Sequence, residues 1–241
     1  MNIVIPMAGA GSRFVKAGYE KPKPFIDVAD QPMVVRVINN LCYHQAKYIL
    51  IARKEHLESE AQTVALIEKD YDVKFIAIDK QTEGTACTVL YAREYIDNDE
   101  PLLIANSDQL VDLTISEFID DCFRRSLDGS ILTFKDKEKN PKWSFVKTDH
   151  EGLVREVKEK VPISDIATVG IYLYSRGKDF VNYAIRMIIE NDRVNNEFYT
   201  CPTYNYAIKD NRKIGIYTID FEQMHGLGTP EDLATYLRRM V

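Results

Sequence analysis

The chain has 241 residues, of which 45% are hydrophobic and 28% are charged, and its formal net charge at pH 7 is −6. This length and balance predict one large α/β domain of a globular protein. An acidic chain without an extended basic run does not favour nucleic-acid binding, and no apolar run approaches the roughly 20 residues that cross a bilayer. We therefore expect no nucleic-acid partner, no membrane partner and, because no signal peptide is evident, a cytoplasmic location.

The first half of the chain alternates strands and helices. Short apolar runs indicate strands, and longer segments with helical periodicity indicate helices. Strands that alternate with helices pair in parallel through right-handed crossovers, and continuous apolar runs are typical of strands that are buried on both faces. The predicted strands are residues 3–6, 48–52, 73–78 and 101–106, and the predicted helices are 32–44, 57–70 and 86–95.

The second half has a different pattern, in which several strands follow one another with turns between them. A closing helix is indicated by Thr229 as N-cap, Pro230 at the first helical position, and Glu231 and Asp232 in the first turn. The chain therefore predicts a Rossmann-like α/β fold: a mainly parallel central sheet flanked by helices, with a smaller antiparallel addition. The predicted strands are 130–135, 143–148, 154–159, 168–174 and 213–219, and the predicted helices are 177–191 and 203–210.

The cysteines and histidines are scattered along the chain. Four of each are present, and neither a C-x-x-C pair nor an H-E-x-x-H pattern occurs among them. This spacing favours reduced thiols and gives no indication of a disulfide framework or a zinc site.

A basic, glycine-rich loop follows the first strand. Gly9 and Gly11 allow a tight turn that brings bare backbone N–H groups against an anion. A local basic loop on an acidic protein predicts a site for a small polyanion. Four cations follow the second glycine within a dozen residues: Arg13, Lys16, Lys21 and Lys23.

Three kinds of phosphate site were compared for this loop. A P-loop requires Gly-Lys-Ser/Thr, whereas Gly11 is followed by Ser12 and Arg13, which excludes it. A dinucleotide site needs a small residue where Phe14 stands and an acid at the end of the second strand, where Arg53 stands. An NADP-linked oxidoreductase stays open because an arginine there could accept NADP. A nucleoside triphosphate held by backbone amides and an arginine is the third possibility, and it explains most of the loop.

The segments Pro6-Met7-Ala8-Gly9-Ala10-Gly11-Ser12-Arg13 and Pro22-Lys23-Pro24 resemble the signature of the sugar-phosphate nucleotidyltransferases, the nucleoside-diphosphate-sugar pyrophosphorylases. Further segments resemble the same family in the same order over nearly the whole chain. They are Glu83-Gly84-Thr85-Ala86, Asn106-Ser107-Asp108, Val157-Lys158-Glu159-Lys160, Thr168-Val169-Gly170-Ile171-Tyr172 and Gly226-Leu227-Gly228-Thr229-Pro230-Glu231-Asp232-Leu233.

The resemblance implies Mg²⁺-dependent transfer of a nucleoside monophosphate to a phosphate monoester, with release of pyrophosphate. An acceptor phosphate oxygen attacks the α-phosphorus in line and needs no general base, so catalysis is mostly orientation and charge neutralisation. The resemblance also implies a single catalytic domain over residues 1–241. The nucleotide-binding half would be about 1–128, and the acceptor-binding additions about 129–228.

The resemblance also assigns roles to individual residues. Arg13 and Lys23 are expected to be catalytic, and Asp108 is expected to bind Mg²⁺, a hard cation that suits carboxylate and phosphate oxygens. The nucleotide is expected to contact Ala8, Gly9, Gly11, Ser12, Arg13, Gln81, Gly84 and Thr85. The acceptor is expected to contact Glu159, Lys160, Gly170 and Glu197.

One departure from the family pattern affects the metal site. Many family members carry a second metal aspartate where this chain has Gly226. A single carboxylate could suffice, Asp220 or His225 could reach the metal, or the triphosphate could hold the other ion. We take Asp220 as the candidate second ligand. Glu197 follows two amides and could contact an acceptor that carries an amine, or it could be an ordinary acid at a helix start.

Likeness over the whole sequence reduces the range of candidate substrates further. The chain resembles the capsule and surface-polysaccharide nucleotidyltransferases, which implies CTP as the nucleotide and phosphoglutamine as the small phosphorylated acceptor, giving CDP-glutamine. A sugar-1-phosphate or phosphocholine nucleotidyltransferase stays open, and so does a catalytically silent nucleotide-binding regulatory subunit. A homodimer is possible, although no segment identifies an interface.

Overall fold

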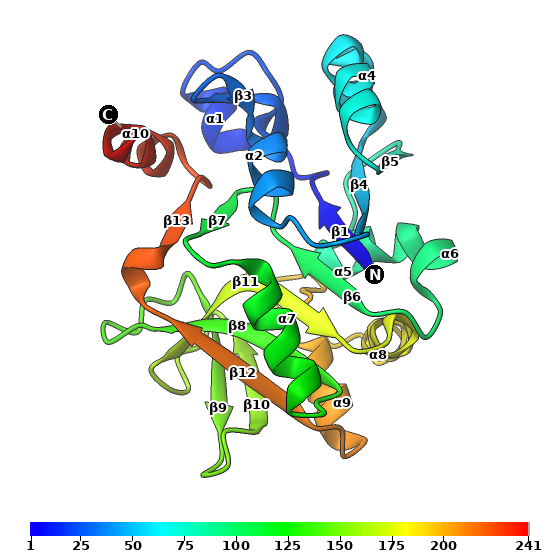
Figure 1. The fold of residues 1–241 in the computed structure, drawn as a ribbon, viewed down its shortest axis with the longest axis vertical. Helices are drawn as coiled ribbons and strands as arrows, with labels where there is room; N and C mark the ends of the chain where they lie inside the picture. Colours follow the sequence, from blue (N-terminus) through cyan, green and yellow to red (C-terminus); the bar gives the residue numbers. More distant parts are fainter. Residues whose placement is uncertain (241) are drawn as a thin grey trace.

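A nine-stranded mixed sheet forms the centre of the protein in a computed structural model that describes residues 1–240 (Figure 1). Two small two-stranded ribbons accompany it: β2 (Asp27–Val28) with β3 (Gln31–Pro32), and β7 (Gln109–Val111) with β13 (Met224–Gly226). The central strands are β1 (Asn2–Pro6), β4 (Lys47–Arg53), β5 (Val73–Ile78), β6 (Leu102–Ala105), β8 (Gly129–Lys135), β9 (Ser144–Thr148), β10 (Val154–Glu159), β11 (Ile166–Tyr174) and β12 (Ile214–Ile219).

The order of the strands separates a parallel half from a mixed half. β5, β4, β1 and β6 pair in parallel, and β11 continues the sheet antiparallel to β6. β8 and β9 both pair antiparallel to β11, β10 pairs antiparallel to β9, and β12 returns parallel to β8. The expected fold class, a mainly parallel sheet with an antiparallel addition in the second half, is confirmed.

Helices cover both faces of the sheet because its central strands are apolar on both sides. Ile3 and Ile5 pack on one face with α2 and α7, whereas Val4 packs on the other face with α5, α8 and α9. No helix within residues 1–240 is long and apolar enough to span a membrane. The α-helices are α1 (Ser12–Lys16), α2 (Met33–Asn40), α3 (Lys54–Ser59), α4 (Ala61–Asp70), α5 (Thr85–Val89), α6 (Arg93–Ile96), α7 (Ile115–Arg124), α8 (Gly177–Ile189), α9 (Thr203–Lys209) and α10 (Pro230–Arg239), and the 3-10 helices are η1 (Lys23–Phe25), η2 (Leu90–Ala92) and η3 (Phe221–Gln223).

Several predicted helices differ from those observed. The segment 86–95 is divided into α5, η2 and α6, and the segment 57–70 is divided between α3 and α4 at Glu60. The sequence analysis omitted α7, although Ile115, Phe118, Ile119 and Cys122 are spaced as on one face of a helix and are all buried. The helices differ chiefly in where they begin and end, and the expected architecture is retained.

The ribbon of β7 and β13 connects the C-terminal segment to the parallel half. Gly226 pairs with Gln109 and Met224 with Val111, and the backbone N–H of Leu227 donates to the carbonyl of Asp108 at 2.7 Å. From this ribbon the chain continues into α10, which lies at the same end of the molecule as α1 (Figure 1). The ribbon thus holds the segment after Gly226 beside the segment after β6.

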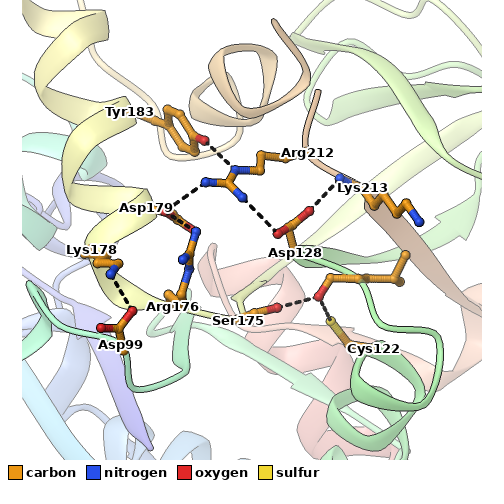
Figure 2. Close-up of polar contacts among 11 residues, drawn as sticks. Asp99, Cys122, Asp128, Ser175, Arg176, Lys178, Asp179, Tyr183, Arg212 and Lys213 are labelled. Carbon is orange, nitrogen blue, oxygen red and sulfur yellow. Dashed lines mark hydrogen bonds and ion pairs between the residues drawn. The ribbon is translucent and has the colours of Figure 1, made fainter. Parts of the chain in front are cut away.

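A cluster of ion pairs lies at the other end of the sheet, where β6 begins and β11 ends. Asp179 is buried and accepts from Arg176 through Nε at 3.0 Å and Nη2 at 3.1 Å, and it also lies 4.0 Å from Arg212 (Figure 2). Lys178 pairs with the exposed Asp99 at 2.5 Å. The cluster connects the start of α8 to the segments that precede β8 and β12.

We expect Asp179→Ala to lower the free energy of unfolding by about 2 kcal/mol, because it leaves two partly buried guanidinium groups without their shared carboxylate. The measurement is urea denaturation at pH 7. Asp99→Ala is the control and should leave stability nearly unchanged, since its carboxylate is largely exposed. Equal losses in the two variants would contradict the structural role given to Asp179.

Candidate active site

Two loops meet at the carboxyl ends of β1 and β6, which are neighbours in the parallel half of the sheet. The loop after β1 carries Gly9 and Gly11, and the segment after β6 is Asn106-Ser107-Asp108. Together with Lys23 they line a cavity of about 390 Å³, which we call cavity I. Ligands of open α/β sheets gather at such strand ends, so cavity I is the first candidate for a binding site.

The structure requires glycine more strictly at one of the two loop positions than at the other. Gly11 has a φ of +59°, a conformation that favours glycine, and a Cβ there would lie 3.2 Å from the Cβ of Lys23. A Cβ on Gly9 would meet no atom within 4 Å, so the space beside it is open. Phe14 is buried and anchors the loop to the core, while Ser12 and Arg13 line cavity I.

Lys23 and Asp108 form an ion pair across cavity I, in which the Lys23 Nζ donates to the Asp108 Oδ2. Pro24 and Phe25, which follow the lysine in η1, are buried and fix the backbone that presents it. Opposite them, a Cβ on Gly228 would lie only 3.0 Å from the Asp108 Oδ2, so glycine gives this carboxylate room. The pair joins segments that are far apart in the sequence.

A second cavity of about 610 Å³, cavity II, adjoins the first. The two cavities share several lining residues, among which Arg13 and Asp108 bring a charge of each sign to their boundary. Arg13 forms no ion pair with another residue of the described chain, and it is exposed. Lys160 and Tyr199 lie elsewhere on the wall of cavity II. Cavity II is therefore a second chamber, which meets cavity I at the Arg13 and Asp108 side chains.

Glu159, the last residue of β10, and Lys160, which follows it, both line cavity II. Glu159 is 8% exposed, accepts a hydrogen bond from the Ser144 hydroxyl, and has a pKa that burial raises. Lys160 adopts a φ of +58° and donates to the Tyr199 hydroxyl at 2.7 Å. Burial and the nearby Glu197 carboxylate raise the pKa of Tyr199. Cavity II thus contains a carboxylate and an ammonium group from adjacent residues.

Gly170 also lines cavity II, and close packing requires glycine at this position. Its φ is +94°, and a Cβ there would lie 2.2 Å from the Asn106 side-chain nitrogen. The backbone N–H of Asn106 donates to the Gly170 carbonyl at 3.0 Å. Glycine at 170 therefore lets β11 approach the segment that carries Asp108.

A third, smaller cavity of about 130 Å³, cavity III, shares Pro6, Gly9 and Thr85 with cavity I. Ala8, Gln81 and Gly84 line it, so the expected nucleotide-binding residues are distributed over cavities I and III. Thr85 lines all three cavities, so they meet around the start of α5.

Glu197, which is expected to contact the acceptor, lines cavity III, and its carboxylate is near Tyr199 of cavity II. The backbone N–H of Phe198 donates to the Glu83 carbonyl at 2.7 Å, which draws residue 197 toward the segment 83–85. Gly84 is needed for this approach, because its φ is +125° and a Cβ there would lie 2.4 Å from the Phe198 carbonyl oxygen. Thr85 supports it further by accepting from both the N–H and the hydroxyl of Thr200 at 3.1 Å.

The expected second metal ligand, Asp220, must be corrected, because it lies outside cavities I and II. It lines a separate cavity with Lys135, and its backbone N–H donates to the Gln223 side-chain oxygen at 2.9 Å at the start of η3. His225 is directed to Asp112, at 2.8 Å from its Nε2. Asp232, which was expected only as an acid in the first turn of α10, lines cavity II together with Asp108 and Glu159.

The residues of cavities I and II fit a magnesium ion in part. Asp108 and Asp232 supply hard oxygen donors, and Mg²⁺ in such sites commonly takes one or two carboxylates and completes its shell with water and substrate phosphates. Within residues 1–240 no group of three histidine, cysteine, aspartate or glutamate side chains is close enough to hold a metal. A metal here would therefore depend on phosphate oxygens from a bound nucleotide.

Comparisons with curated proteins, solved structures and a family profile all indicate one protein family. The curated relatives include the mannose-1-phosphate guanylyltransferase catalytic subunit beta of Dictyostelium discoideum, 25% identical over 73% of this chain and 50% of the relative. They also include the bifunctional protein GlmU of Methanococcus aeolicus, 26% identical over 72% of this chain and 40% of the relative. The chain thus spans half or less of the length of these two relatives.

The solved structures include one that matches over almost its whole length. The nucleoside-diphosphate-sugar pyrophosphorylase from Vibrio cholerae RC9 superposes with a TM-score of 0.83 at 26% identity, covering 98% of this chain and 99% of that one. The profile of the family described as nucleotidyl transferase matches residues 3–234. The chain therefore belongs to the nucleotidyl transferase family, among the sugar-phosphate nucleotidyltransferases of the nucleoside-diphosphate-sugar pyrophosphorylase type.

Proposed function

We propose that the protein transfers a nucleoside monophosphate from a nucleoside triphosphate to a phosphorylated acceptor, with release of pyrophosphate. One observation carries this proposal: cavities I and II meet at Arg13 and Asp108, beside the ammonium group of Lys23. Two adjoining chambers with charged groups at their boundary suit a reaction between two phosphorylated molecules. The family to which the chain belongs supports the same chemistry.

The residues that line the three cavities support a placement for both substrates. The base would occupy cavity III beside Gln81 and Gly84, and the triphosphate would lie in cavity I along the glycine loop. The acceptor would occupy cavity II with its phosphate near Lys160. The α-phosphorus would then lie near the boundary of cavities I and II, where an acceptor phosphate oxygen can approach it in line.

The cations of the boundary would act by neutralising charge. The two substrates repel each other, and negative charge is redistributed over the phosphoryl oxygens as the new bond forms and pyrophosphate leaves. Arg13 would bind the triphosphate, and Lys23 would exchange its contact with Asp108 for phosphate oxygens of the bound nucleotide. Asp108 would hold a Mg²⁺ ion together with phosphate oxygens of the nucleotide, and Asp232 lines the same cavity; the ion would supply further positive charge.

The acceptor class is a phosphate monoester. The named relatives include a mannose-1-phosphate guanylyltransferase, which favours a sugar 1-phosphate. CTP and phosphoglutamine stay predictions from sequence likeness and belong in the same test. A silent regulatory subunit would have no physical need for Arg13, Lys23 and Asp108 around one cavity, which favours an enzyme.

The proposal is tested by measuring pyrophosphate release from CTP, GTP, UTP, dTTP and ATP, each with phosphoglutamine, phosphocholine, mannose 1-phosphate or glucose 1-phosphate. Each pairing is run with and without Mg²⁺. We expect at least one pairing to yield a nucleoside-diphosphate conjugate only when Mg²⁺ is present. Nucleotide binding without turnover in any pairing would instead support a silent subunit.

Replacing the lysine at the boundary should affect turnover more than nucleotide binding. We expect Lys23→Ala to lower kcat about 100-fold and to change the Kd for the triphosphate less than about threefold, since its charge matters most as the two anions approach. The measurements are steady-state kinetics and calorimetric titration. Lys21→Ala is the matched control, because that lysine is paired with Asp27 and lines neither cavity I nor cavity II. Equal kcat values for Lys23→Ala and the unmodified protein would contradict the role of Lys23.

Removing the carboxylate of Asp108 should raise the Mg²⁺ concentration that gives half-maximal rate by about tenfold or more and should slow turnover sharply. Asp108→Asn keeps the shape of the side chain and removes its charge. Asp220→Asn serves as the control and should leave the Mg²⁺ titration unchanged, because that residue lies at another cavity. An Mg²⁺ requirement that shifts with Asp220→Asn and not with Asp108→Asn would reverse the assignment.

A further inference from the structure

One buried polar side chain on the wall of cavity II has no assigned role. Gln109 is 6% exposed and directly follows Asp108 at the start of β7. Its Nε2 is buried and has no hydrogen-bond partner within the described residues. A buried donor without a partner costs free energy, so such a group in a cavity wall calls for an explanation.

The backbone around Gln109 is held firmly. β7 pairs with β13, and Asn40 exchanges two side-chain hydrogen bonds with the backbone of Val111, at 2.8 and 2.9 Å. The next two side chains, Leu110 and Val111, are both buried in the core, whereas Gln109 lines cavity II. The amide is thus presented from a rigid element, as a group that recognises a ligand should be.

The residue opposite Gln109 in the ribbon leaves space beside it. Gly226 is its pairing partner, and a Cβ on Gly226 would have the Asp232 carboxyl group as its nearest neighbour, at 3.9 Å. Both Gln109 and Gly226 line cavity II. The terminal amide torsion of glutamine is soft, so the amide can rotate to meet a ligand group that enters cavity II.

We propose that the side-chain amide of Gln109 is a specificity-determining contact for the acceptor, donating a hydrogen bond from Nε2 to an acceptor oxygen. The inference rests on the proposed function, because it identifies cavity II as the acceptor site. It adds a requirement for the substrate: besides its phosphate, the acceptor carries a hydroxyl or carbonyl oxygen that reaches Gln109.

The polar groups of cavity II restrict further which acceptors can bind. Glu159 brings a buried carboxyl group to the same wall, and its ionised form can only accept hydrogen bonds. An acceptor that satisfies both side chains therefore presents an oxygen to Gln109 and an O–H or N–H donor to Glu159. Phosphorylated sugars and phosphorylated amino-acid amides both meet this requirement, whereas the quaternary ammonium group of phosphocholine offers neither partner.

The test replaces Gln109 with methionine, which has nearly the same length and lacks both polar atoms. We expect Gln109→Met to raise the KM for the acceptor about tenfold while kcat and the KM for the triphosphate change less than about twofold. The melting temperature should stay the same or rise, because an unpartnered buried donor is removed. A side chain with a purely structural role would not separate the two KM values in this way.

Ser130→Ala is the matched control. Ser130 is fully buried in β8, its Oγ also has no partner within the described chain, and it does not line cavity II. Its replacement should leave every kinetic constant unchanged. Acceptor analogues that each lack one oxygen complete the design: for one of them, the unmodified protein and Gln109→Met should have the same KM.

The outcomes separate this inference from the proposed function. If the unmodified protein turns over no pairing of nucleotide and acceptor, the proposed function falls. If it turns over a pairing and Gln109→Met keeps the same acceptor KM, the proposed function stands and the inference about Gln109 is overturned. An equal rise in both KM values would also overturn it, because the residue would then act on the site as a whole.

Discussion

The parallel pairing of β1 with β6 is the constraint on which the rest of the site depends. Its register places Val4 beside Ile104, so both strands end at one edge of the sheet, and the loops that follow them must meet. The Lys23–Asp108 ion pair is the most direct result, since it joins these two loops across cavity I. The ribbon of β7 and β13 then brings the segment after Gly226 to the same place.

Much of the fold could be predicted because local patterns determine it. Short apolar runs such as residues 48–52 and 101–106 indicate buried strands, and Thr229 with Pro230 fixes the start of α10. The boundaries of α5 and α6 could not be predicted in this way, because a 3-10 turn between them interrupts one continuous helical pattern. The two short ribbons were missed because a strand of two or three residues has no periodicity to detect.

The residues of the candidate site also fall into two groups, those that the local sequence predicts and those that it does not. Residues in contiguous motifs, such as Gly9, Gly11 and Asp108, could be identified from the sequence because neighbouring residues determine their geometry. Asp232 and Gln109 could not, since each reaches cavity II through the pairing of β7 with β13, which are distant in the sequence. The position of Glu197 in cavity III could not be predicted either, because the backbone contact between Phe198 and Glu83 decides where it lies.

That contact has a consequence for how substrate preference can change. The Phe198 backbone forms hydrogen bonds to residues on both sides of Gly84: its N–H donates to the Glu83 carbonyl, and its carbonyl accepts from the Ala86 N–H. The next residue, Tyr199, lines cavity II. Cavity III and cavity II therefore share one stretch of main chain. Under the proposed placement of base and acceptor, a mutational path that remodels cavity III for a different base would also displace a wall of cavity II, so the two preferences would change together through this segment.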